Sequence, residues 1–264
     1  EGVEILQPGY AIEYDFLNPQ GLSSDLESGL LSGLFLAGQI NGTTGYEEAA
    51  SQGLVAAIGV AKRLLGAAPI QFDRSTSYIG VMIDDLTSRG ATEPYRMFTS
   101  RAEFRLKLRA DNADQRLTDQ GYTSGCVSSE RFAQYTEKIE KLTACRHSLS
   151  DMAVSPNQAR VAGIDLGLDG RRRNGHELLA IPGVSIQQLR VLEPSLIDRD
   201  IEALKQAGRE ALYVTYIERQ GRDIEALARD LSIQIPTAFE YAGISGLSSE
   251  MIAKLSEARP QTLG

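Results

Sequence analysis

The sequence predicts a mainly helical α+β fold, in which a small α/β portion is followed by a largely helical region. Residues 33–61 run from a short apolar stretch through a glycine-containing loop into an Ala- and Gly-rich segment, the order of strand, loop and helix. Residues 101–109 alternate charged and apolar side chains, which is typical of a strand. After about residue 128, apolar residues recur three and four positions apart, as on amphipathic helices.

Composition is that of a globular protein outside the membrane and secretory classes. The 264 residues are 42% hydrophobic and 23% charged, and no apolar run approaches the ~20 residues that cross a bilayer. We therefore expect a cytoplasmic protein with no membrane contact. Cys126 and Cys145 are expected to be reduced thiols. His147 and His176 have no partner at metal-ligand spacing, so no metal site is expected.

The N-terminal half is expected to contain four elements. A buried strand at 34–37 leads through the loop at 38–45 into a helix that ends at Gly66. A second helix is expected over 75–90, capped at Ser75 or Thr76 and closed by Gly90, and the strand at 101–109 follows.

The C-terminal half is expected to be helical. A helix starts at Ser128, short helices and loops occupy 153–195, a long helix runs from about 198 to 230, and Ser248 caps a helix at 251–258. We accordingly divide the chain into four segments: 1–68, 69–127, 128–235 and 236–264.

The glycine-containing loop is the clearest candidate binding element. A strand, a glycine loop and a helix N-terminus together aim backbone N–H groups at an electron-rich ligand, and amide and hydroxyl side chains can orient it. The loop supplies such side chains at Gln39, Asn41, Thr43 and Thr44. The alternative is an ordinary strand–turn–helix packed in an α/β core, whose loop residues bond only to their own backbone.

Several motifs in the same order resemble the glucose-inhibited division protein A family (MnmG/GidA), flavoproteins that modify the wobble uridine of certain tRNAs. The strongest is AGQINGTTGYEEAASQGL at 37–54. The others are PGYAIEYDF at 8–16, EPYRMFTSRAEFRL at 93–106, DNADQRLT at 111–118 and GLSSE at 246–250. The resemblance covers most of 8–145, is weak at about 150–200 and returns at 213–264.

The resemblance implies FAD as cofactor, with the loop as one part of its site. The implied contacts are Gln39, Asn41, Gly42, Thr43 and Gly45. The Gly-x-Gly-x-x-Gly pyrophosphate motif is absent, and neither cysteine matches the family's catalytic ones. The chain therefore resembles the C-terminal portion of a longer enzyme, in which 1–68 is a remnant of the FAD-binding α/β domain. Its catalytic residues remain unknown, and the isolated portion is expected to be inactive.

RNA binding is favoured by a local cluster of cations, although the net charge of the whole chain is negative. The net charge is −8, which opposes general attraction to nucleic acid. The segment around the expected strand nevertheless carries five cations suited to phosphate contacts: Arg96, Arg101, Arg105, Lys107 and Arg109. Tyr95 and Phe98 are positioned to stack on unpaired bases. The alternative is a solvated strand face whose cations pair with neighbouring carboxylates.

For the whole enzyme, the resemblance implies transfer of a (carboxymethyl)aminomethyl group to C5 of the wobble uridine. It also implies NADH as reductant, a homodimer, and an MnmE-type GTPase that docks on a domain beginning at 236–264. Two alternatives remain: an FAD/NAD oxidoreductase unrelated to RNA, and a non-catalytic helical module that binds a partner.

Overall fold

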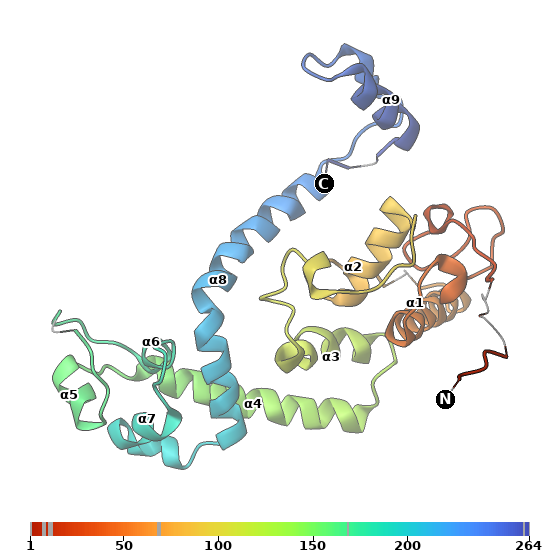
Figure 1. Cartoon of the computed structure of the whole chain (residues 1–264). Helices are drawn as coiled ribbons and strands as arrows, with labels where there is room; N and C mark the ends of the chain where they lie inside the picture. Colours follow the sequence, from red (N-terminus) through yellow and green to blue (C-terminus); the bar gives the residue numbers. More distant parts are fainter. Residues whose placement is uncertain are drawn as a thin grey trace.

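The structure, a computed structural model, describes residues 2–6, 9, 13–67, 70–167, 169–260 and 262–263. These residues form an elongated, mostly helical molecule (Figure 1). An N-terminal body carries α1, α2 and α3, and a second body carries α5, α6 and α7. The helices α4 and α8 run between these parts, and α8 continues upward to a separate small unit around α9 (Figure 1).

Nine α-helices are described. Their bounds are α1 Tyr46–Leu64, α2 Tyr78–Asp84, α3 Ala113–Thr123, α4 Ser129–Asp151, α5 Pro156–Val161, α6 Gly175–Leu179, α7 Ile186–Leu192, α8 Ile201–Ser232 and α9 Ser249–Ala258. A π-helical turn, Asp85–Arg89, extends α2. Short 3-10 turns lie at Pro19–Gly21, Gln39–Asn41, Thr99–Arg101, Ala110–Asn112, Pro194–Ile197 and Tyr241–Gly243. In this part of the chain, none of the helices combines the length and apolarity needed to cross a membrane.

The two strands expected from the sequence do not form. At 34–37, one isolated antiparallel bridge joins Phe35 to Glu27, and Leu34 is exposed. At 101–109, the backbone makes turns in which Lys107 N–H and Leu108 N–H both donate to Phe104 C=O. An extended segment needs a neighbouring strand to take its backbone hydrogen bonds. Residues 34–36 make two such bonds, Ser28 N–H to Leu34 C=O and Leu36 N–H to Leu26 C=O, and in the described structure the pairing extends no further than the single bridge. Local turns satisfy the backbone of 101–109 instead.

The alternation at 101–109 nevertheless predicted much of the burial, although Leu106 is only half-buried and Arg109 is enclosed. Ala102, Phe104 and Leu108 are at most 8% exposed, although the segment is not extended. Ala102 and Leu108 pack against α2, where Val81 is fully buried beside them. A turn that brings Phe104 and Leu108 to one side buries the same side chains as a strand would.

Helix starts follow the capping chemistry that the sequence predicted, with one shift. The side chains of Ser128 and Ser248 accept the N–H groups of Arg131 and Met251 at the starts of α4 and α9, as expected. The cap of α2 is Ser77 rather than Ser75 or Thr76. The helical region at its far end closes at Gly90, as expected.

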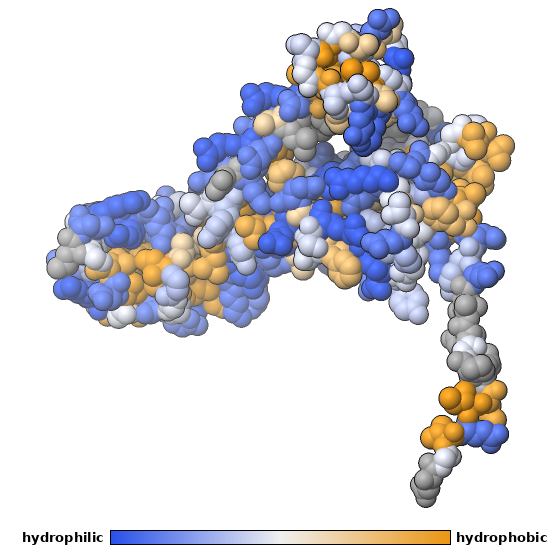
Figure 2. Space-filling view, turned by 45° about the horizontal axis from the view of Figure 1, so that its top comes forward, coloured by the Kyte–Doolittle hydropathy of each residue, from blue (hydrophilic) through white to orange (hydrophobic). Residues whose placement is uncertain are grey.

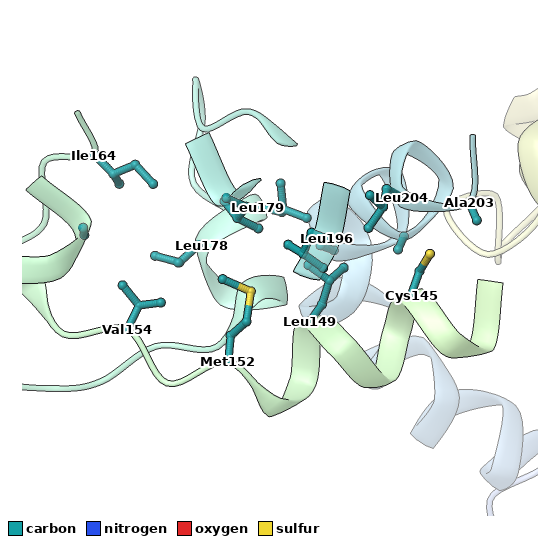
Figure 3. Packing of buried hydrophobic residues seen from close by; sticks show 14 of the residues in the cluster. Cys145, Leu149, Met152, Val154, Ile164, Leu178, Leu179, Leu196, Ala203 and Leu204 are labelled. Carbon is teal, nitrogen blue, oxygen red and sulfur yellow. The ribbon is translucent and has the colours of Figure 1, made fainter. Parts of the chain in front are cut away.

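The largest core belongs to the helical region. Leu142, Cys145 and Leu149 of α4 face Leu178 and Leu179 of α6 and Leu204 of α8 (Figure 3). These side chains are almost completely buried, and burial of each contributes about 1.5–3 kcal/mol. Apolar side chains therefore pack α8 against α4, and this packing sets the direction in which α8 leaves the core.

Apolar side chains are also left in solvent near the N-terminus. Val3, Ile5 and Leu6 are 92%, 72% and 88% exposed. A tail with hydrophobic atoms extends at the lower right of Figure 2. The outer face of α1 adds further exposed apolar residues, including Leu54 and Val60.

The core predicts unequal roles for two leucines of α8. Leu204→Ala leaves a cavity at a fully buried position, so the free energy of unfolding should fall by about 2–5 kcal/mol. Leu212→Ala, at a position 49% exposed, should change it by less than about 0.5 kcal/mol. Urea denaturation followed by circular dichroism compares the two, and equal losses would contradict this assignment of the core.

Candidate functional site: a pocket beside a cationic segment

A pocket of about 290 Å³ lies beside the glycine-containing loop. Three segments form its walls: residues 14–16, the loop from Gln39 to Thr44, and residues 91–94. The lining residues are Tyr14, Asp15, Phe16, Gln39, Gly42, Thr43, Thr44, Ala91, Thr92, Glu93 and Pro94. An aromatic, apolar and amide lining of this kind suits a flat polar ligand.

The loop is held in shape by one buried side chain, Gln52 of α1. Its Oε1 accepts the N–H of Gly38 (3.0 Å) and Nδ2 of Asn41 (2.8 Å). Its Nε2 donates to Oγ1 of Thr43 (2.9 Å) and to the carbonyl of Glu48 (3.1 Å). Because Gln52 is completely buried, these bonds form without competition from water.

The five residues implied as cofactor contacts separate into two groups. Gln39 is exposed and Gly42 half-buried, and both line the pocket. Asn41 and Thr43 are buried, and their side chains bond inside the loop: Asn41 Nδ2 to Leu36 C=O and Thr43 Oγ1 to Gly38 C=O. Gly45 is the N-cap of α1 and is not part of the pocket wall. The side chains of Asn41 and Thr43 therefore stabilise the loop through hydrogen bonds to nearby backbone carbonyls and to Gln52.

Gly42 is required by both conformation and space. Its φ is +82°, in the left-handed region, and an added Cβ would lie 2.9 Å from Cβ of Ala91 and 3.0 Å from the ring of Phe16. Its absent side chain therefore lets two pocket walls meet.

The segment that carries the cations is bonded directly to the loop. Tyr95 N–H donates to Gly42 C=O (2.8 Å) and Thr44 N–H donates to Tyr95 C=O (3.3 Å), which form a parallel bridge. The phenol of Tyr95 donates to Asp85 Oδ2 (2.9 Å), and burial together with this bond raises the pKa of Tyr95. The pocket and the cationic segment are consequently neighbours.

Arg74 anchors the cationic segment from below. Its guanidinium bonds Asp85 (2.7 Å), Asp84 (2.8 Å) and Glu103 (2.6 Å). Burial disfavours the charge of Arg74, but the bonds to Glu103 and Asp85 outweigh it and raise its pKa. The three carboxylates at this position are therefore ion-paired with Arg74. Among the residues described, no group of three or more His, Cys, Asp or Glu is arranged to hold a metal ion.

The five cations suggested for RNA are not equivalent. Arg109 is the most enclosed: it pairs with Asp111 (2.9 Å) and lies 4.7 Å from the ring centre of Tyr213. Arg101 stacks on Tyr95 at 4.2 Å and donates to Arg96 C=O. Arg96 lies 3.5 Å from the carboxylate of Glu48 but is half exposed. Arg105 and Lys107 have no acidic partner within the described part of the chain.

Sequence reasoning missed Gln52 and Arg74, which shape the site, and did not identify the partners of a third such residue, Glu48. Each is buried or nearly so and polar, and each bonds to a segment distant in sequence. A polar residue on the inner face of an amphipathic helix was the available signal for Gln52. Of the polar residues at 10–15, Tyr10 lies outside the described residues, Glu13 is exposed, and Tyr14 and Asp15 line the pocket.

Comparison with known proteins covers nearly the whole chain. Three family models match: "Glucose inhibited division protein A" at residues 1–68, the "tRNA modifying enzyme MnmG/GidA C-terminal helical domain" at 129–221, and the "C-terminal helical bundle" of the same enzyme at 223–264. The chain belongs to the MnmG/GidA family. The resemblance found in the sequence motifs is thereby confirmed, including over the stretch where those motifs are weak.

Relatives of this family match at high identity. A tRNA uridine 5-carboxymethylaminomethyl modification enzyme MnmG from Granulibacter bethesdensis is 45% identical over 98% of the chain, and one from Syntrophotalea carbinolica is 46% identical over 100%. The chain spans 41% and 43% of these relatives. GidA of Aquifex aeolicus in its form II crystal matches with a TM-score of 0.78 at 36% identity, covering 94% of this chain and 39% of that one.

The bracing of the loop predicts that Gln52 contributes to stability. Gln52→Ala leaves the buried Gly38 N–H without an acceptor, so the free energy of unfolding should fall by about 2 kcal/mol or more. Gln39→Ala, at an exposed position in the same loop, is the control and should change it by less than about 0.5 kcal/mol. Urea denaturation measures both, and an unchanged midpoint for Gln52→Ala would show that the loop does not depend on this amide.

Proposed function

We propose that this chain is part of an FAD-dependent enzyme that adds a (carboxymethyl)aminomethyl group to C5 of the wobble uridine of tRNA. One observation carries the proposal: in a member of the MnmG/GidA family, the pocket at the glycine-containing loop is hydrogen bonded to a cation-bearing segment. A redox cofactor and an RNA substrate have to meet in such an enzyme, and these two surfaces are adjacent.

The residues present fit one end of FAD. A pocket of about 290 Å³ is at the lower limit for small-molecule sites, large enough for a ring system and too small for the whole dinucleotide. Gln39, Gly42 and Thr44 would hold the ring edge, and the adjacent N-terminus of α1 begins at Gly45 without a side-chain cap.

Bound FAD would supply the hydride and electron chemistry that amino-acid side chains lack. This chain would orient one edge of the ring, exclude water through Phe16, Ala91 and Pro94, and place the RNA backbone nearby. Arg96, Arg105 and Lys107 are the cations free to contact phosphate, whereas Arg101 and Arg109 would act by supporting the segment.

Further partners follow from the same assignment. We propose NADH as the reductant of the complete enzyme, a homodimer, a cytoplasmic location, and an MnmE-type GTPase docked on the unit at 236–264. The α9 unit stands apart from the two bodies, and Met251 and Phe239 on it are partly exposed, which supports a docking role (Figure 1). The 264-residue chain by itself is expected to be inactive, because it offers only one end of the flavin site.

The flavin assignment predicts a local effect at Gln39. In the complete polypeptide, Gln39→Ala should raise the dissociation constant of FAD about 5- to 10-fold through loss of one hydrogen bond, with stability unchanged. Gln187→Ala, an exposed glutamine on α7, is the control. Flavin fluorescence titration measures both, and equal affinities would remove Gln39 from the site.

The RNA assignment predicts a salt-dependent effect of three cations. Replacing Arg96, Arg105 and Lys107 together with Ala in the complete polypeptide should weaken tRNA binding at least 10-fold and flatten its dependence on salt, because fewer counterions are released. The control replaces Arg160, Lys205 and Lys254, exposed cations of α5, α8 and α9, with the same change in net charge. If both variants bind tRNA alike, an oxidoreductase unrelated to RNA becomes the better assignment.

A further inference from the structure

Glu48 of α1 makes an unusual contact for a residue in the first turn of a helix. A glutamate at this position commonly folds back onto the start of its own helix. Here the carboxylate lies over the helix start and its Oε1 also accepts the N–H of Met97, 49 positions away, at 2.7 Å, and lies 3.5 Å from Nε of Arg96. Glu48 is 3% exposed, so its contacts with Met97 and Arg96 are shielded from solvent.

The same carboxylate explains why residue 45 is glycine. The φ of Gly45 is −101°, which any residue can adopt, so conformation does not demand glycine there. A Cβ at this position would overlap Oε2 of Glu48. Gly45 therefore leaves room for the carboxylate to fold over the helix start and reach Met97.

Glu48 keeps its charge in this enclosed position. Burial alone would raise its pKa, but hydrogen bonds from the backbone N–H groups of Met97 and of Glu48 itself, together with the charge of Arg96, outweigh burial and lower it from the ordinary 4.5. A charged acceptor makes a hydrogen bond stronger than a neutral one, so the Met97 contact is among the strong links of the segment.

Three links together join the pocket to the cationic segment. Two are the backbone bonds between Tyr95 and residues 42 and 44, and the third is the carboxylate of Glu48. Glu93 and Pro94 lie on the pocket wall, and Arg96 follows two residues later with its guanidinium half exposed. The backbone of this short stretch is thus held at Tyr95 and at Met97.

We propose that Glu48 is a positioning residue that couples occupancy of the pocket to binding of RNA by the segment 93–97. A ligand that orders the wall at Glu93 and Pro94 pre-orders Arg96 through the same stretch, and RNA bound at Arg96 orders the wall in return. Such coupling is reciprocal and is typically 5-fold or more. This inference rests on the proposed function for the identity of the two ligands, but the contact itself does not.

Amide hydrogen exchange tests the contact without any ligand. In the complete polypeptide, Glu48→Ala should speed exchange of the Met97 amide about 10-fold or more, because its acceptor is lost. Glu48→Gln retains an acceptor oxygen and should protect the amide better than Ala does. Glu47→Ala, the exposed neighbour, should leave exchange as in the parent protein. Unchanged exchange in Glu48→Ala overturns the proposal.

Binding then tests the coupling. The affinity for tRNA is measured with the protein loaded with FAD and freed of it, and we expect the loaded form of the parent protein to bind about 5-fold more tightly. Glu48→Ala should reduce this ratio to nearly one, whereas Glu47→Ala should keep it. A ratio of one in the parent protein, or an undiminished ratio in Glu48→Ala, overturns the proposal while leaving the function intact. Failure of the parent protein to bind FAD or tRNA contradicts the proposed function instead.

Gly45 supplies an independent variant that retains the carboxylate. Gly45→Ala should displace Glu48 from Met97 and reproduce both effects, faster exchange and a lost ratio. In a Glu48→Ala background the same change should add little, because the space is no longer needed. Additive effects of the two substitutions would show that Gly45 serves another purpose and would overturn this part of the argument.

Discussion

The described N-terminal body depends on one buried amide. Gln52 faces inward on α1 and satisfies, with a single side chain, a backbone donor at Gly38 and side chains at Asn41 and Thr43. A loop that carries several glycines has high conformational entropy when unfolded, so it needs strong internal bonds to hold one shape. Because Gln52 is held in place by α1, the position of α1 determines where the loop at the pocket edge lies.

The second constraint is the attachment of the cationic segment to that loop. Backbone bonds from Tyr95, the ring hydroxyl on Asp85 and the guanidinium of Arg74 fasten residues 93–103 from three sides. Arg101 and Arg109 therefore have structural roles, and a count of positive charges overstates the surface available to RNA. Arg96 stays exposed because its neighbours Tyr95 and Met97 make the bonds that hold the segment in place.

The helical half was more predictable because its helices follow local rules of capping and apolar spacing. Serine caps at 128 and 248 predicted the starts of α4 and α9, and apolar residues at helical spacing predicted the positions of α4 and α8. The two expected strands were wrong because alternation reports which side chains are buried, and a turn at Phe104 buries the same ones.

The sequence by itself determined the family, the helices with their caps, and the loop that borders the pocket. Those features depend on residue types at short spacing, and local rules of capping, periodicity and glycine conformation read them directly. The tertiary structure alone decided that Asn41 and Thr43 turn inward, that Arg109 is enclosed, and that Glu48 reaches Met97. Each of these joins a polar group to a partner outside its own turn, and a buried polar group takes whichever partner folding brings within reach.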